Sequence, residues 1–184
     1  IAMAWIEAAS VYYLRLLVDR VVPYQPNPMP VAGALGAVEL VREAATLVML
    51  VTVGVLAGAT WQQRLGYTSI AFGVWDIFYY LWLKVLLDWP ASLMSRDLLF
   101  LVPVPWVGPV WAPCLISLGL ITFAFVVFRG RSRDPRFRLD LWSWVLLISG
   151  AVLMIISFTI DPLLRSYGLE ALSSAGSASD HALV

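Results

Sequence analysis

Long uncharged stretches constrain this chain more than any other feature. Residues 98–128 contain no charged side chain, and residues 141–160 form a second uncharged stretch. A helix needs about 20 mostly apolar residues to cross roughly 30 Å of hydrocarbon. The whole chain is 61% hydrophobic and 13% charged, whereas soluble domains have roughly 45–50% and 25%. This composition excludes a disordered chain and predicts an all-α, polytopic bundle of transmembrane helices.

The apolar stretches divide the chain into about five predicted spans. They cover residues 1–19, 33–59, 66–87, 108–128 and 141–160. Residue 1 already lies inside an apolar run, so we expect a truncated first span and a natural chain that begins earlier. We expect one transmembrane domain over residues 1–170. The serine-rich residues 171–184 are predicted to be a disordered tail.

A segment rich in proline and tryptophan separates the third and fourth spans. Proline lacks a backbone donor and resists helix, so residues 98–106 are predicted to be interfacial or re-entrant. We expect this segment to form an aromatic platform at the outer interface, as an anchor, a lid over polar groups or a docking surface. The predicted outer platform comprises Asp97, Pro103, Pro105, Trp106, Pro109 and Trp111.

Arginine predicts the orientation of the spans. The loop that follows the fourth span contains Arg129, Arg131, Arg133, Arg136 and Arg138. By the positive-inside rule, loop 129–140 is cytoplasmic. Arg64 then falls on the same side, and the C-terminal tail lies outside. These arginines are interpreted first as topology determinants, although they would also attract anionic lipid headgroups.

Ionisable residues inside the first three spans are the candidate functional groups. Each costs roughly 2.5–3.5 kcal/mol in lipid on insertion scales, so such residues normally face protein or water and form pairs. Spacings of three or four residues place them on one stripe of each helix. We expect the three stripes to face one another in a cluster that opens toward the outside. The cluster comprises Glu7, Arg15, Glu39, Arg42, Glu43, Asp76, Tyr80 and Lys84.

Carboxylates outnumber cations in this cluster by one, and we expect Asp76 or Glu7 to be the odd group. A buried carboxylate without a partner takes up a proton or holds a cation. One reading is that the cluster only holds three helices in register, a second is a pocket for a ligand, ion or proton, and a third is a catalytic or metal site. The only histidine is His181 and the only cysteine is Cys114, so no metal site and no cofactor are predicted. The formal net charge of zero argues against a nucleic-acid partner.

The second predicted span contains a small-residue motif. Gly54 and Gly58 are four residues apart, and this spacing is typical of closely packed helix pairs in membranes. We therefore expect another helix to lie against these two glycines.

Three blocks of the sequence resemble small, uncharacterised multi-pass membrane proteins of bacteria. They are Arg42-Glu-Ala-Ala-Thr-Leu47, Phe72-Gly-Val-Trp-Asp-Ile-Phe-Tyr-Tyr80 with Trp82-Leu-Lys84, and Asp97-Leu-Leu-Phe-Leu-Val-Pro-Val-Pro-Trp-Val-Gly-Pro109. The resemblance covers residues 1–128. It implies a bacterial cytoplasmic membrane, but no activity, cofactor or catalytic residue.

Three functions are compatible with these patterns. The first is a non-catalytic accessory or structural subunit of a larger membrane complex, for example an energy-converting one. The second is a stand-alone transporter or binding protein whose outward pocket takes a proton, a cation or a small polar ligand. The third is a membrane enzyme that acts on a lipid, for which no nucleophile motif is present. We expect the lipid bilayer, bound lipids and other membrane subunits as partners.

Overall fold

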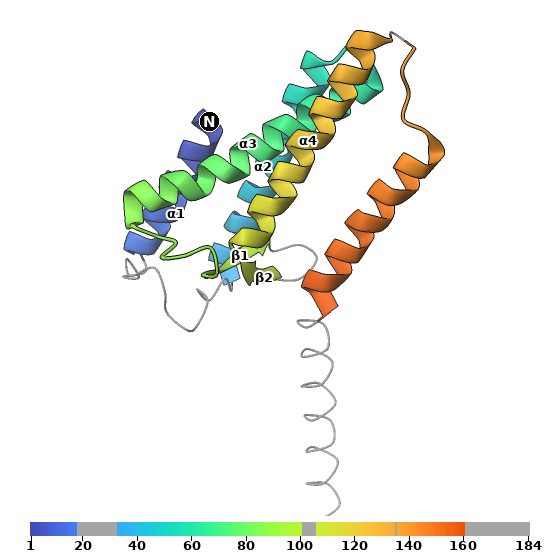
Figure 1. Ribbon diagram of the computed structural model, residues 1–184. Coiled ribbons are helices and arrows are strands. Elements are labelled where there is room, and N and C mark those ends of the chain that lie inside the picture. Colours follow the sequence, from blue (N-terminus) through green and yellow to red (C-terminus); the bar gives the residue numbers. More distant parts are fainter. Residues whose placement is uncertain (18–32, 101–105, 135, 161–184) are drawn as a thin grey trace, which may run out of the picture. The chain divides into compact units, whose positions relative to one another are not determined.

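The computed structural model describes residues 1–17, 33–100, 106–134 and 136–160 (Figure 1). Within them the chain is mostly helical, with five helices and two short strands, so the predicted helical fold is confirmed at that level. The predicted tail at residues 171–184 lies outside the described residues. In chain order the elements are α1 (Ala2–Leu17), α2 (Gly33–Ala57), α3 (Trp61–Leu87), β1 (Arg96–Phe100), β2 (Trp106–Pro109), α4 (Trp111–Arg133) and the helix Leu141–Ile160.

Four helices in the described part of the chain are long and apolar enough to cross a membrane. They are Ala34–Ala57, Trp61–Leu87, Trp111–Arg133 and Leu141–Ile160. The 16 residues of α1 give a length of about 24 Å at about 1.5 Å per residue, which is shorter than the hydrocarbon layer. A first span over residues 1–19 therefore stays a prediction.

The third helix begins earlier than residue 66, where the sequence analysis placed its start. Thr60 caps α3 through a capping box: its hydroxyl accepts from the Gln63 amide (3.4 Å), and Gln63 Oε1 accepts from the Thr60 amide (3.1 Å). This reciprocal pair satisfies two of the amides that a helix start leaves without partners. The helix therefore gains a polar first turn that an apolar-run criterion leaves out.

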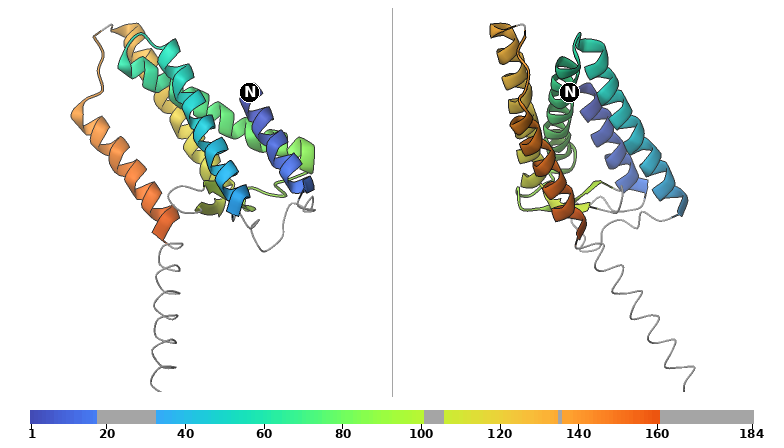
Figure 2. Two further views of the ribbon diagram at one scale, coloured as in Figure 1. Left: turned by 180° about the vertical axis from the view of Figure 1, so that it is seen from behind. Right: turned by 90° about the vertical axis from the view of Figure 1, so that its right-hand side faces the viewer.

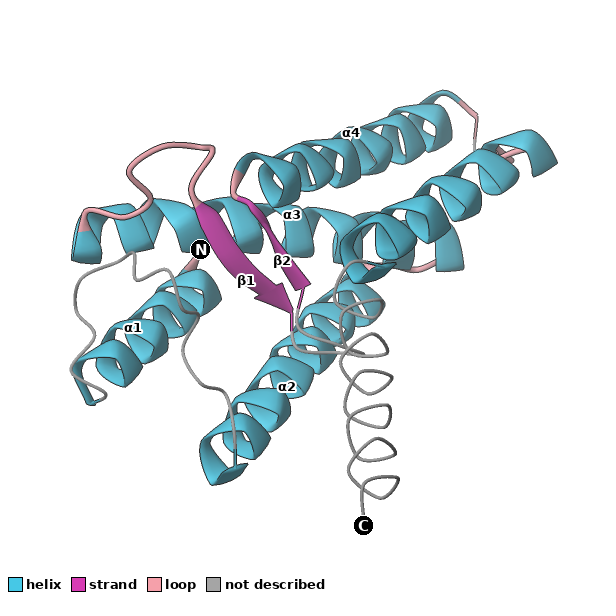
Figure 3. Cartoon of the chain, turned by 90° about the horizontal axis from the view of Figure 1, so that it is seen from below, coloured by secondary structure: helices cyan, strands magenta, loops and turns pink. Residues whose placement is uncertain are grey.

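The described chain forms two compact units. One comprises Ile1–Asp97 with Pro109–Leu139, and the other comprises Leu98–Gly108 with Asp140–Val184. In the first unit α3 is the central helix, because α1, α2 and α4 each pack against it. Figures 2 and 3 show α4 on one side of α3, with α1 and α2 on the other. The predicted single domain extends to residue 170, and residues 161–170 lie outside the described residues, so it stays a prediction.

Small residues let these helices approach α3 closely. A Cβ atom at Gly54 would lie 2.6 Å from the Thr68 backbone nitrogen, and a Cβ at Gly73 would lie 2.7 Å from the Ser117 carbonyl oxygen. Real Cβ atoms do not approach backbone this closely, so both positions require glycine. Gly58 likewise faces the backbone of Arg64. The Gly54 and Gly58 motif therefore lies at the contact between α2 and α3.

Part of the proline-rich segment forms strands. β1 and β2 pair in a two-stranded sheet, an element that the all-α prediction did not include. Asp97 lies in β1, Trp106 and Pro109 lie in β2, and Trp111 opens α4, which begins three residues later than predicted because β2 occupies residues 106–109. Pro103 and Pro105 lie outside the described residues, and the re-entrant course of this segment stays a prediction.

The second unit contains the helix Leu141–Ile160. Asp140 precedes it, and its Oδ1 accepts hydrogen bonds from the Ser143 amide (3.1 Å) and from the Ser143 hydroxyl. An aspartate in this position is a favourable N-cap, because it satisfies a free amide and places negative charge at the helix start. These hydrogen bonds lower the pKa of Asp140 below its usual 3.8.

Candidate functional site

An ion-pair network joins α1 to α2. Arg42 forms an ion pair with Glu7 and donates to Glu39 Oε2 from Nε (3.0 Å) and Nη2 (2.7 Å). Thr46 Oγ1 donates to the second oxygen of Glu7 (3.2 Å). Glu43 also interacts electrostatically with Arg42. The structure thus brings together four residues of the predicted cluster, namely Glu7, Glu39, Arg42 and Glu43. We name Glu7, Glu39, Arg42 and Thr46 the α1–α2 network.

The side chains of the α1–α2 network are mostly buried but keep some exposed surface. The side chains of Arg42, Glu7 and Glu39 are 28%, 13% and 15% exposed. Charge-assisted hydrogen bonds of this kind are about twice as strong as neutral ones, and each charge would be costly if it faced lipid alone. The network therefore gives two helices a specific register while its edge remains accessible from outside the chain.

Asp76 lies in a different contact, between α3 and α4. Ser117 donates a hydrogen bond of 2.8 Å to Asp76 Oδ2, and both side chains are buried. The sequence analysis left the fourth span without a polar role, and the structure corrects this. A serine in an apolar span is a recognised partner for polar groups on a neighbouring helix. Ser117 is therefore the residue from which this contact could have been predicted.

Tyr80 ties the strand region to α3. Its hydroxyl donates to Asp97 Oδ2 over 3.1 Å, so a residue of the predicted cluster contacts a residue of the predicted outer platform. The Tyr80 ring itself is buried in the core together with Ala8, Leu83, Trp89 and Val110. Asp97 is thereby held against the end of the helix bundle.

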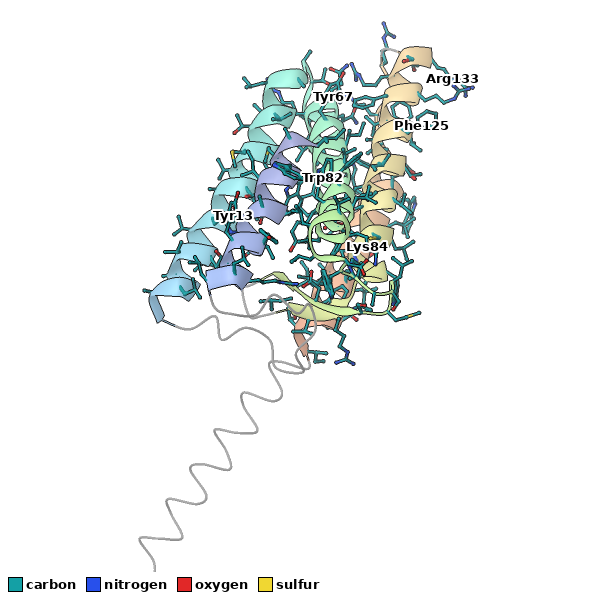
Figure 4. All side chains as sticks on the ribbon, turned by 90° about the vertical axis from the view of Figure 1, so that its left-hand side faces the viewer. Tyr13, Tyr67, Trp82, Lys84, Phe125 and Arg133 are labelled. Carbon is teal, nitrogen blue, oxygen red and sulfur yellow. The ribbon has the colours of Figure 1, made fainter. Side chains whose placement is uncertain are left out.

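Lys84 lies apart from the other predicted residues. Its ammonium nitrogen is 2.7 Å from Asp88 Oδ1 and donates to the Asp88 carbonyl oxygen over 3.2 Å, and both side chains are exposed. The hydrogen bond and the charge of Lys84 lower the pKa of Asp88 below its usual value. Figure 4 shows Lys84 toward the end of the bundle opposite Tyr67. Lys84 therefore stabilises the end of α3, where Asp88 adopts a left-handed cap with φ of 52°.

Arg15 stacks on an aromatic ring. Its guanidinium carbon lies 5.1 Å from the centroid of Trp89, a distance typical of a cation–π contact. The Trp89 side chain is itself buried in the core of the first unit. Burial of the ring gives Arg15 an apolar surface to cover, which the sequence alone did not reveal.

Tyr79 was not among the predicted site residues, yet it is close to several of them. It interacts electrostatically with Asp97, Arg15, Arg42 and Asp76, and its ring packs against Trp75 and Tyr80. Further aromatic side chains meet between α1 and α3: the ring centroids of Trp5 and Trp82 lie 5.0 Å apart in an edge-to-face arrangement. The charged groups thus surround a common aromatic centre but bond in separate pairs.

The described residues contain no group of three or more His, Cys, Asp or Glu side chains placed to hold a metal ion. In the α1–α2 network, the guanidinium of Arg42 holds the carboxylates of Glu7 and Glu39. Such groups can bind a cation or exchange a proton, and they can also simply cross-link helices.

Comparisons with protein-family models, curated proteins and solved structures find no match for this chain. The resemblance of its three sequence blocks to bacterial membrane proteins accordingly stays a prediction. Function is inferred below from the contacts of the described residues.

Proposed function

We propose that this chain is a non-catalytic accessory or structural subunit of a larger bacterial membrane complex. The observation that carries the proposal is the double engagement of Arg42, which bonds Glu7 on α1 and Glu39 on α2. Its guanidinium is used to hold two helices together. A group used in this way is poorly suited to release and rebind a ligand during a transport or catalytic cycle.

The other buried polar contacts support the same reading. Asp76 with Ser117 links α3 to α4, and Tyr80 with Asp97 links α3 to β1. Each bond satisfies a polar group whose burial without a partner would cost about 1–3 kcal/mol. The hydrogen bonds of Asp76 and Tyr80 thus link elements of the first unit.

The outer surface of α2 offers a place for a partner. Its contact with α3 runs through Gly54 and Gly58, while Val41 and Val48 lie exposed on the helix at seven-residue spacing. Lipid tails and a partner helix are both compatible with such a surface. We propose that a second polypeptide covers part of the exposed surface of α2.

Purification from native membranes tests the proposal. The full chain is extracted in a mild detergent, and mass spectrometry identifies the polypeptides that migrate with it on a native gel. A photo-crosslinking residue at Val48 (65% exposed) should label a co-purifying polypeptide. Val85 on α3, which is 71% exposed, is the matched control for non-selective labelling. Migration as a lone monomer, or the same labelling from both positions, would contradict the subunit proposal.

A second candidate is a stand-alone transporter or binding protein. It is favoured by one observation, the 13–28% exposure of Glu7, Glu39 and Arg42, which leaves an edge of the network accessible to a proton or cation. Under this alternative, Glu39→Gln should change proton or cation binding by the reconstituted protein without unfolding it. A variant that loses only stability would favour the subunit proposal.

A further inference from the structure

A cavity lies at the end of the first unit where α3 begins and α4 ends. It has a volume of about 620 Å³ and is lined by Thr60, Trp61, Gln62, Arg131, Arg136 and Arg138. We name it the arginine cavity. Figure 4 shows Tyr67 and Arg133 toward this same end of the bundle. The sequence analysis interpreted the arginines first as topology determinants that would also attract anionic lipid headgroups, but it did not predict a cavity shared with the start of α3.

Specific contacts hold the arginine loop in place. Gly130 leaves room for the ring of Phe137, because a Cβ at residue 130 would lie 2.6 Å from Phe137 Cε1. The side-chain amide of Gln62, which is 5% exposed, lies 3.2 Å from the Phe137 carbonyl oxygen and 3.2 Å from the Leu139 amide nitrogen. The amide orientation that suits both partners donates to the carbonyl and accepts from the Leu139 amide. Arg131 Nη1 also lies 3.5 Å from the Phe137 carbonyl oxygen.

These contacts determine where the charges lie. With Phe137 anchored, its two neighbours Arg136 and Arg138 line the cavity opposite the first turn of α3. In the same loop, Asp134 Oδ1 accepts from the Arg136 backbone amide (2.8 Å), so Asp134 shapes the turn. Among the described residues, the cavity lining therefore includes three arginines and no acidic residue.

The first turn of α3 adds to this positive potential. Trp61 and Gln62 are its first helical residues, so their amides lack carbonyl partners within the helix, and the helix dipole is positive at this end. Together with guanidinium groups, such a helix start favours a phosphate or another oxyanion. The three arginines of the lining make this more than a bare helix terminus.

The position of the cavity along α3 and α4 indicates which source would supply a phosphate. Both α3 and α4 are long and apolar enough to cross a membrane, and the cavity lies where one begins and the other ends. In a bilayer spanned by α3 and α4, this end of the two helices lies at the level of the lipid phosphates. The exposed Trp61 favours the same depth.

We propose that the arginine cavity binds the phosphate group of an anionic lipid headgroup. A soluble phosphate ester shares this chemistry and is the other source that the test must distinguish. The inference does not depend on the subunit proposal, because it concerns the opposite end of the bundle from Lys84 and Asp97 and needs no second polypeptide.

Binding of defined lipids to the full chain tests this site. Short-chain phosphatidylglycerol, phosphatidylcholine and glycerol 3-phosphate are titrated into the detergent-solubilised protein, and native mass spectrometry measures the bound fractions. The pocket variant is Arg136→Gln with Arg138→Gln. The matched control is Arg129→Gln with Arg133→Gln, which removes the same charge from two arginines that are exposed like Arg136 and Arg138 but do not line the cavity.

We expect phosphatidylglycerol to bind at least about tenfold more tightly than phosphatidylcholine, and the pocket variant to lose most of this preference, since guanidinium–phosphate pairs are strong and directional. The control should change affinity less than about twofold, since Arg129 and Arg133 do not line the cavity and act on a bound phosphate only through screened, longer-range charge. Glycerol 3-phosphate that binds as tightly, with the same sensitivity to the pocket variant, would uphold the phosphate site but assign it to a soluble ester.

Equal losses in the pocket variant and the control would overturn the proposal, because they would reflect overall charge alone. An absence of preference for phosphatidylglycerol and of glycerol 3-phosphate binding would also overturn it. If the glutamine pair does not fold, Arg136→Lys with Arg138→Lys serves instead, since lysine keeps the charge but lacks the bidentate fork. Binding weakened at least about threefold then supports the site, and unchanged binding contradicts it.

Discussion

Arg42 and Glu7 form an ion pair between two helices although 35 positions separate them in the chain (42 − 7 = 35). The same guanidinium also bonds Glu39 on its own helix. One cation therefore balances carboxylates from both sides of a helix contact, and this contact makes the clearest predictions about stability.

Replacement of Arg42 by glutamine should destabilise the protein. Glu7 and Glu39 would lose their cation, and breaking a well-buried pair costs about 3–5 kcal/mol. Because Arg42 is 28% exposed, we expect a smaller loss, about 1–3 kcal/mol. Thermal unfolding in detergent measures it. Arg42→Lys, which keeps the charge, is the control and should lose less; equal midpoints for Arg42→Gln and the wild type would rule out a stabilising role for the network.

Asp76 should tolerate asparagine better than alanine. An asparagine carbonyl can still accept the hydrogen bond from Ser117, whereas alanine leaves the buried serine hydroxyl without its acceptor. We expect Asp76→Ala to lower the free energy of unfolding by about 1–3 kcal/mol and Asp76→Asn to lower it by less. Denaturant titration of both variants makes the comparison. A larger loss for asparagine than for alanine would show that the carboxylate does more than accept from Ser117.

A methyl group at Gly73 should separate α3 from α4. The added Cβ would lie 2.7 Å from the Ser117 carbonyl oxygen, so the helices must shift, and overpacking of this kind typically costs about 1–3 kcal/mol. Gly119→Ala on α4 is the matched control, because nothing lies within 4 Å of its added Cβ. Helix propensity alone should make that variant neutral or slightly more stable. Unfolding midpoints that fall equally in both variants would contradict the close contact at Gly73.

Asp140 should titrate below its usual pKa of 3.8, because Ser143 donates to its carboxylate. A carboxylate with a depressed pKa stabilises the folded state above the unfolded-state value, and this contribution is lost as pH falls through the folded-state pKa. A carboxyl-carbon NMR titration of the full chain measures the midpoint. Ser143→Ala removes the hydroxyl donor and should raise that midpoint; a midpoint unaffected by the substitution would exclude the hydroxyl as a cause.

Much of the helical architecture was predictable because it follows from the length of apolar runs. The helix Leu141–Ile160 coincides with a predicted span, and α2 departs from its prediction by two residues at one end. The start of α3 was missed although Thr60 and Gln63 form a readable capping box. The strands β1 and β2 were not predictable from prolines and aromatic residues that also suit an irregular segment.

The candidate site was predictable only in part. Of the residues predicted from charged stripes at helical spacing, Glu7, Glu39 and Arg42 meet in one network. Periodicity does not give the rotation of one helix relative to another. The pairing of Asp76 with Ser117 on α4, and the retention of Lys84 beside Asp88, depend on that rotation.

The order of the helices along the chain gives these pairs different histories during synthesis. Glu7 and Arg42 belong to the first two helices described, so they can neutralise each other as soon as α2 has emerged from the ribosome. Asp76 must wait for Ser117, 41 residues further on. During synthesis the Asp76 carboxyl group therefore lacks its hydrogen-bond donor until α4 has been made.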